Sequence, residues 1–297
     1  MYRIHTIRWG LLGPLLLVAL LAAAQALAQP RTLIYNKALN VNQRYSVGLL
    51  ELAFSYFPGK YELKETPEFY EQAKHFQEFE IGNIDVTWAG TEADLERRYR
   101  PIRIPLFKGL LGNRLFIIRQ GDQARFDRVE TLEDLKRIHL GQGRTWADTE
   151  ILRANGLKVI TTNKYVNLFP MLEGGRFDAF PRGAHEPWSE IKDWEHLNLT
   201  VEKRLLLVYR MPLYFFVKKT DQELGDDLEE GLNRAIADGS FDEYFFNSSL
   251  VRDVLKQANL QDRTAFMLEN PKMTPETPVE REELWLNISD LANDLDN

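Results

Sequence analysis

The sequence predicts an α/β protein made of two lobes that are joined by a hinge of two crossovers. A chain of 297 residues is long enough for two globular units. Strand-like and helix-like segments alternate in a βαβαβ order twice, once before residue 101 and once after residue 119, and this alternation is typical of parallel sheets. Paired extended segments at 101–119 and 205–217 separate the two sets. The chain is therefore expected to leave the first lobe, build the second and return.

The first lobe is expected to open with a strand and a helix. Apolar residues recur at helical spacing from Tyr45 until Pro58 and Gly59 interrupt the pattern. A second strand and an amphipathic helix follow, and Gly82 and Asn83 precede a third strand. The expected segments are strand 32–35, helix 45–57, strand 61–66, helix 71–79 and strand 84–89.

The second lobe repeats this order. Thr131 and Asp134 have the spacing of a capping box at a helix start, and Thr145 and Asp148 have the same spacing at the start of a helix that Gly156 ends. The expected segments are a helix from 131, strand 138–141, helix 145–155, strand 158–161, helix 165–172 and strand 177–180. After the second crossover, an amphipathic helix is expected over 221–238.

The first 28 residues have the pattern of a secretory signal peptide. Basic residues precede the apolar run 11–24, and Ala26 to Ala28 form an A-x-A cleavage pattern. The alternative is an uncleaved membrane anchor, but a spanning helix needs about 20 apolar residues and Gln25 ends the run. We therefore expect cleavage after Ala28 and a periplasmic location.

Composition excludes several functions. The net charge of −7 argues against nucleic acid or an anionic membrane surface as partner. The chain has no cysteine, which rules out a thiol nucleophile, disulfides and a lipid-modified N-terminus. Common hydrolase, zinc-protease and nucleotide-binding motifs are missing from the sequence. No cofactor, metal or catalytic residue is expected.

Four segments carry a resemblance to a known family: IGNIDVTWAGTEADLERRYRPIRIPLFKG, LEDLKRIHLGQGRTWADTEIL, LEGGRFDAFPRG and IADGSFDEYFFN. In order and spacing they resemble the type II periplasmic solute-binding proteins, in the branch of extracellular solute-binding proteins family 3. The likeness runs from about Thr32 to about Ser248. A subgroup that shares the phrases GLLG-R-L-F-I-I-R, GQG--W-DT-IL and FD-FPRG with this chain is described as a transporter substrate-binding domain. The resemblance implies a type II fold in which lobe closure around a small solute precedes delivery to a membrane transporter.

The resemblance also implies a division of the chain. A signal peptide is expected at 1–28, the first part of lobe 1 at 29–110, lobe 2 at 111–208, and the second part of lobe 1 at 209–250. A C-terminal extension, 251–297, is expected to pack on lobe 1, where Leu284 and Trp285 could hold it.

In two-lobe α/β binders the ligand lies beyond the carboxyl ends of the strands. Ligand-binding candidates at those positions are Tyr35, Trp88, Thr91 and Arg97 in lobe 1, and Arg144, Thr145, Trp146, Arg182 and Glu186 in lobe 2. The three aromatic residues could equally well be core residues, because aromatic side chains usually pack.

The resemblance places Arg97 where amino-acid binders hold the ligand carboxylate by a bidentate pair, although Arg98 or Arg100 could take that place. Thr145 matches the helix N-terminus that the family offers to an anion, and Arg144 beside it would add positive charge. A plain N-cap and a solvated basic turn are the alternatives.

A departure from the family pattern concerns the ligand. Where amino-acid binders carry an aspartate for the ligand's amino group, this chain has Gly183, with Arg182 beside it. An anionic or carboxylate-bearing ligand is therefore expected. Glu186 is either a replacement acid or a first-turn residue that suits the helix dipole, and His185 has no companion at metal-ligand spacing.

Binding is the favoured function, and the expected protein is a monomer whose partners are a small-molecule ligand and a membrane permease. One alternative is a ligand sensor coupled to a membrane signalling receptor. A second is a periplasmic lyase or dehydratase of the same fold, such as the cyclohexadienyl dehydratases.

Overall fold

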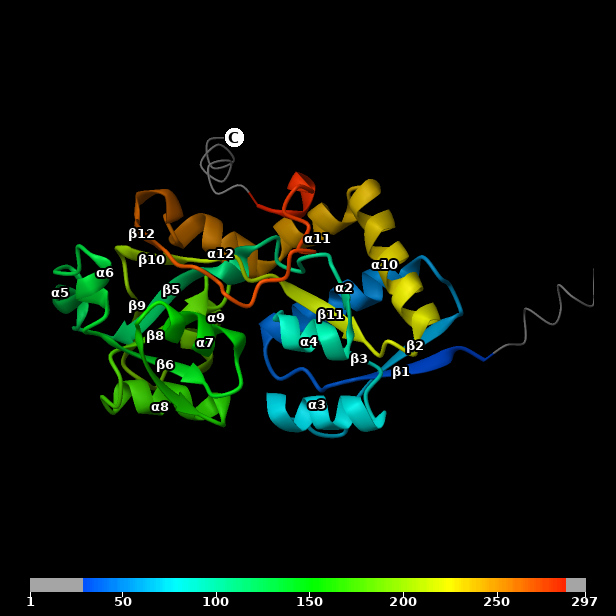
Figure 1. The fold of residues 1–297 in the computed structure, drawn as a ribbon, viewed down its shortest axis with the longest axis horizontal. Helices are drawn as coiled ribbons and strands as arrows, with labels where there is room; N and C mark the ends of the chain where they lie inside the picture. Colours follow the sequence, from blue (N-terminus) through cyan, green and yellow to red (C-terminus); the bar gives the residue numbers. More distant parts are fainter. Residues whose placement is uncertain (1–28, 287–297) are drawn as a thin grey trace, which may run out of the picture.

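The computed structural model describes residues 29–286, so the expected signal peptide lies outside the described residues. Figure 1 shows two lobes side by side, with the strands of each covered by helices. Within 29–286, no helix combines the length and the apolar character needed to cross a membrane.

Lobe 1 is built from two small sheets and five helices. Strand β1 pairs in parallel with β2, while β11 runs antiparallel to both β3 and β4. The strands are β1 Arg31–Tyr35, β2 Tyr61–Glu65, β3 Val86–Gly90, β4 Arg100–Ile102 and β11 Leu213–Val217. The helices are α2 Val41–Ser55, α3 Gln72–Ile81, α4 Ala93–Arg98, α10 Gln222–Ala237 and α11 Ser240–Asn247.

Lobe 2 has one larger sheet in the order β12-β10-β5-β8-β6-β7, with β9 beside β5. Its strands are β5 Asn113–Arg119, β6 His139–Gly143, β7 Lys158–Thr162, β8 Ala179–Gly183, β9 Leu199–Val201 and β10 Leu205–Val208. Its helices are α5 Gln123–Phe126, α6 Leu132–Leu135, α7 Ala147–Ala154, α8 Leu168–Glu173 and α9 Pro187–Asp193. Helix α12 Ser249–Gln257 and strand β12 Thr264–Met267 belong to the C-terminal extension, and short 3-10 turns lie at Leu110–Gly112, Tyr165–Asn167, Leu260–Asp262 and Glu282–Leu284.

The mixed α/β class and the two-lobe arrangement expected from the sequence are confirmed. Two segments connect the lobes near β4–β5 and β10–β11, where the Tyr209 backbone N–H donates a hydrogen bond to the Gly112 carbonyl oxygen at 3.0 Å. A side chain at Gly112 would meet the Tyr209 carbonyl oxygen at 2.0 Å. Only glycine therefore allows the two crossing segments to lie so close.

Helix α2 is held at both its start and its C-terminal end. Asn40 caps it by accepting a hydrogen bond from the Gln43 backbone N–H at 3.0 Å. In its last turn, α2 packs against α10 at Gly231, where an added Cβ would lie 2.2 Å from the Ala53 carbonyl oxygen. The cap and this close contact fix the position of α2 relative to the lobe 1 core.

One of the two expected capping boxes forms. Thr131 and Asp134 make the reciprocal pair at the start of α6. The expected box between Thr145 and Asp148 is wrong, since α7 begins at Ala147 with Trp146 as an N-cap that makes no side-chain hydrogen bond. The Asp148 carboxylate instead contacts side chains that are distant in the sequence, as described below.

The C-terminal extension contacts both lobes rather than lobe 1 alone. Helix α12, Ser249–Gln257, packs in the lobe 1 core. Strand β12, Thr264–Met267, then joins the lobe 2 sheet by parallel pairing with β10. The chain then contacts lobe 1 again, where the Lys272 ammonium forms a salt bridge with Glu92 at 2.9 Å. Residues 287–297 of the expected extension lie outside the described residues.

Candidate functional site

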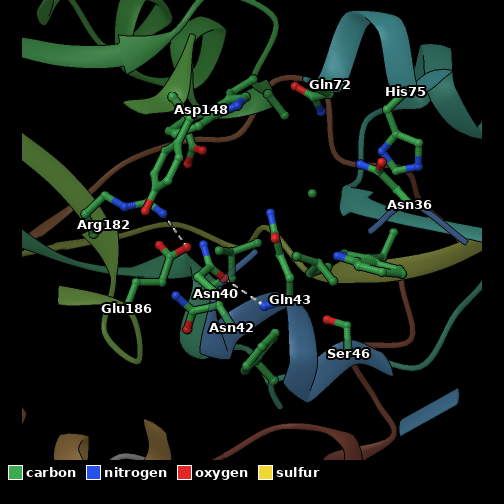
Figure 2. A pocket seen from close by; sticks show the side chains of 18 of the residues that line it. Asn36, Asn40, Asn42, Gln43, Ser46, Gln72, His75, Asp148, Arg182 and Glu186 are labelled. Atoms are coloured by element: carbon green, nitrogen blue, oxygen red, sulfur yellow. Dashed lines mark hydrogen bonds and ion pairs between the residues drawn. The ribbon is translucent and has the colours of Figure 1, made fainter. Parts of the chain in front are cut away.

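A cavity of about 210 Å³ lies where the two lobes meet. Lobe 1 contributes the loop after β1, the start of α2 and parts of α3 and β3, while lobe 2 contributes the start of α7, the end of β8 and the turn before α9. Figure 2 shows side chains from both lobes directed toward this space. A cavity of this size is smaller than most drug-binding pockets and suits a solute about as large as an amino acid.

The lobe 1 wall is rich in amide and hydroxyl groups. The amide residues and the serine that line it are Asn36, Asn40, Asn42, Gln43, Gln72 and Ser46. Both polar atoms of the Asn36 side chain are hydrogen-bonded to the Tyr70 backbone: Nδ2 donates to the carbonyl at 2.9 Å, and Oδ1 accepts from the N–H at 3.0 Å. Asn42 is different, because neither its Nδ2 nor its Oδ1 has a hydrogen-bond partner among the described residues, although its side chain is only 9% exposed. Such an unmet buried amide is unusual and calls for a partner from outside the chain.

The lobe 2 wall contains a buried ionic network. The Arg182 guanidinium donates to Glu186 at 2.6 Å and to Glu190 at 2.6–3.1 Å. It also lies over the rings of Trp146 and Phe180, at 5.0 and 4.8 Å from their centroids. Burial lowers the pKa of Arg182, but the two carboxylates more than offset this effect and the net shift is upward.

The two carboxylates around Arg182 differ in their surroundings. Burial raises the pKa of Glu190, against the influence of Arg182. Glu186 accepts hydrogen bonds from Arg182 and from the Gly183 backbone N–H at 2.6 Å. Each residue of this network is thus engaged within the protein.

A second guanidinium, that of Arg114, is also buried beside the cavity. It lies 2.7 Å from Asp148 Oδ1, which the Tyr209 hydroxyl also contacts at 2.6 Å. Burial lowers the pKa of Arg114, and Asp148 offsets this so that the net shift is upward. The second Asp148 oxygen, Oδ2, makes no hydrogen bond within residues 29–286, and Asp148 lines the cavity.

Two neutral histidines complete the lining. His75 faces Thr87, with 2.8 Å between Nε2 and Oγ1, and burial lowers the pKa of its imidazole to about 4. His185 stacks on Phe107 at 3.8 Å between ring centroids, and burial together with Arg114 and Arg182 lowers its pKa well below the usual value. The His185 Nδ1 is buried and has no partner among the described residues.

Four of the residues expected in the site line this cavity: Trp88, Trp146, Arg182 and Glu186. Trp88 and Trp146 also contact the hydrophobic clusters of lobe 1 and lobe 2, so the core and cleft interpretations both hold for them. The remaining five do not line it: Tyr35, Thr91, Arg97, Arg144 and Thr145.

Arg97 lies on the outer side of α4. Its side chain is 71% exposed and pairs with Asp94 one turn earlier. The alternatives do not replace it, since Arg98 pairs with Glu80 and Arg100 with residues of α10. None of these three arginines is therefore positioned to hold a solute in the cavity.

The other four residues have local roles. Thr91 donates to Glu96 at 2.6 Å, and Tyr35 is half-buried with its ring centroid 6.5 Å from that of Trp88. Thr145 donates to Gln72 at 2.9 Å, a contact between the lobes in which Gln72, but not Thr145, lines the cavity. Arg144 is exposed.

The expectation of an anionic ligand is corrected by this geometry. It rested on Arg182 standing next to Gly183, but Glu186 and Glu190 neutralise Arg182, and Asp148 neutralises Arg114. These buried groups comprise three carboxylates and two guanidiniums. The lobe 2 wall therefore has no excess positive charge that could bind an anion.

The sequence reasoning missed the amides and Asp148. A usable signal was the segment NKALNVNQR at 36–44, which places four amide side chains between a strand and a helix. Asp148 was assigned to a capping box, because sequence spacing cannot reveal that Arg114 and Tyr209 lie beside it.

By sequence, no family model and no curated protein matches this chain. By structure, an ancestral arginine-binding protein matches with a TM-score of 0.56 at 16% identity, over 75% of this chain and all of that one. The chain has the fold of a two-lobe solute-binding protein.

Two further structures share this binding-protein fold. A Salmonella typhimurium periplasmic binding protein with high arginine specificity matches with a TM-score of 0.55 at 12% identity, over 73% of this chain and 97% of that one. The substrate-binding protein of an amino-acid ABC transporter matches with a TM-score of 0.52 at 12% identity, over 74% and 99%. At these identities the likeness establishes the type II binding-protein fold and leaves the ligand to the chemistry of the site.

Proposed function

We propose that this chain binds a small polar solute between its lobes and hands it to a membrane permease outside the cytoplasm. The observation that carries the proposal is the cavity of about 210 Å³ whose walls come from both lobes and include the unmet amide of Asn42. A solute in this position contacts both walls at once, so it stabilises the closed arrangement relative to the open one.

Amino-acid-sized, neutral, zwitterionic or cationic solutes suit the cavity best. The buried network of the lobe 2 wall holds one more carboxylate than guanidinium. The solved structures with this fold include proteins that bind arginine and one that serves an amino-acid ABC transporter, which supports capture followed by delivery.

Binding rather than catalysis is the proposed activity. A general base needs a free lone pair beside the reacting group and a pKa near the working pH. Glu186 is bound by Arg182 and the Gly183 N–H, and Asp148 is held by Arg114 and Tyr209. Burial lowers the pKa of both His75 and His185 away from the working pH. The arrangement favours holding a solute over transferring its protons.

The test is a thermal-shift screen of residues 29–297 against amino acids, amides, amines, sugars and organic acids. A solute that binds only the folded protein raises its stability by about 2.7 kcal/mol at a hundredfold excess over Kd. Gln43→Trp, which fills the cavity from a half-exposed position on α2, should abolish the shift while leaving the protein folded. A full panel without any stabilising solute would contradict the proposal.

A further inference from the structure

The polar groups left unmet in the cavity define the chemistry of the solute. We infer that Asn42 and Asp148 together bind a small cation that also carries a neutral carboxamide. This inference rests on the proposed binding function and names the class of solute that the same cavity takes.

Asn42 demands two kinds of partner. Its side chain lines the cavity, and both Nδ2 and Oδ1 are buried without a partner in the described part of the chain. A carboxylate can only accept hydrogen bonds, whereas a carboxamide both accepts and donates. A carboxamide on the solute therefore satisfies both atoms of Asn42, and a carboxylate leaves Oδ1 unmet.

The position of Asn42 also provides a place for the carbonyl oxygen of the solute. It lies in the first turn of α2, a helix of 15 residues with no acidic residue in that turn. The N-terminus of a helix carries partial positive charge and backbone N–H groups without intrahelical partners. A carbonyl oxygen of the solute fits beside these groups, as its N–H fits the Asn42 Oδ1.

Asp148 supplies the negative charge that would bind the cationic group of the solute. Its Oδ1 is used by Arg114 and Tyr209, while Oδ2 makes no hydrogen bond within residues 29–286 and belongs to a cavity-lining side chain. Because the network around it already has an excess carboxylate, an ammonium group completes the charge balance of the site. Figure 2 shows Asp148 on one side of the cavity and Asn42 on another, so one elongated solute can contact both.

The remaining polar residues of the cavity are less suited to this selection. Asn36 is used at both ends by Tyr70, and the Asn40 oxygen caps α2. Lys37 and Glu71 also line the cavity, but the Lys37 ammonium lies 3.6 Å from a Glu65 carboxylate oxygen and Glu71 accepts a hydrogen bond from the Tyr165 backbone N–H at 3.4 Å. Asn42 and Asp148 therefore select the carboxamide and the ammonium group of the solute, while the unmet Nδ1 of His185 can contact a further polar atom.

The decisive experiment uses calorimetric titration of residues 29–297 with matched solutes. The series consists of ω-amino amides of increasing length, from 3-aminopropanamide through 4-aminobutanamide to 5-aminopentanamide. Each is compared with the ω-amino acid of the same length, which replaces the amide with a carboxylate, and with the simple amide that lacks the amine. The amino amide of the best length should bind about tenfold or more tightly than both, since each comparison leaves one buried group unmet.

Asn42→Asp provides the complementary test. The variant exchanges the Asn42 amide for a carboxylate of the same shape, so the preference for the amino amide should fall about tenfold and the α,ω-diamine of matching length should become the better ligand. Asn163→Asp makes the same change at an exposed residue outside the cavity lining and should keep the wild-type order. If Asn42→Asp fails to fold, the wild-type series decides.

The outcomes separate the two proposals. Tighter binding of the ω-amino acid, tighter binding of an organic acid, or an unchanged order in a folded Asn42→Asp would overturn the inference. Binding of some other solute class, with none of the amino amides bound, would overturn it as well while leaving the proposed function in place. A protein that binds nothing in either panel would contradict both.

Discussion

Lowering the pH should destabilise this protein through His75. The imidazole is 7% exposed and contacts Thr87 Oγ1, and its burial lowers the pKa from 6.5 to about 4. Between these two values the unfolded chain binds a proton at His75 and the folded chain does not. The free energy of unfolding therefore falls as the pH decreases through this window.

The magnitude follows from the size of the shift. One pKa unit corresponds to about 1.36 kcal/mol, so a shift from 6.5 to about 4 gives a loss of about 3 kcal/mol by pH 4. Most of the window has been crossed at pH 5, where the expected loss relative to pH 7.5 is about 2 kcal/mol. At neutral pH the histidine is uncharged in both states and has no such effect.

Urea unfolding at pH 7.5 and pH 5.0 measures this loss in the wild type and in His75→Gln. Glutamine keeps a polar group near Thr87 but does not titrate, so the wild type should lose about 2 kcal/mol more than the variant over this interval. Carboxylates and His185 titrate alike in both proteins, and their contributions cancel in the comparison. His196→Gln changes an exposed histidine and should behave as the wild type does. Equal losses in wild type and His75→Gln would refute the reasoning.

Three further predictions concern the scaffold. Gly231→Ala should lower the free energy of unfolding by about 1–3 kcal/mol, because its Cβ would lie 2.2 Å from the Ala53 carbonyl oxygen. Urea titration measures this loss, and an unchanged urea midpoint of unfolding would show that α2 and α10 separate easily. Arg182→Met should cost about 3–5 kcal/mol by leaving buried carboxylates uncompensated, and adding Glu190→Met should restore part of that loss; a double variant less stable than the single one would contradict this account. Phe266→Ala, in strand β12, should cost about 3 kcal/mol or more, whereas a wild-type melting temperature would mean that β12 contributes little to the lobe 2 sheet.

The order of elements was readable from the sequence because helix and strand periodicity is a local property. The opening segments of lobe 1, from strand 32–35 to strand 84–89, correspond closely to β1 through β3. The two crossovers were readable as well, since glycine and proline interrupt the extended runs on both sides of lobe 2. Trp88 and Arg182 could be placed near the cavity because they lie close to the carboxyl ends of the expected strands 84–89 and 177–180.

Only the tertiary structure decided which charges the cavity offers. Arg182 suggested an anion site in the sequence, yet helix α9 brings Glu190 onto it, eight positions away. Asp148 had the spacing of a cap, but β5 and the second crossover bring Arg114 and Tyr209 to its carboxylate. The physical reason is that electrostatic pairing depends on distances across the packed interior, whereas local spacing along the chain constrains only neighbours on the same element. The same reason explains β12, whose place beside β10 in lobe 2 comes from packing between segments far apart in the chain.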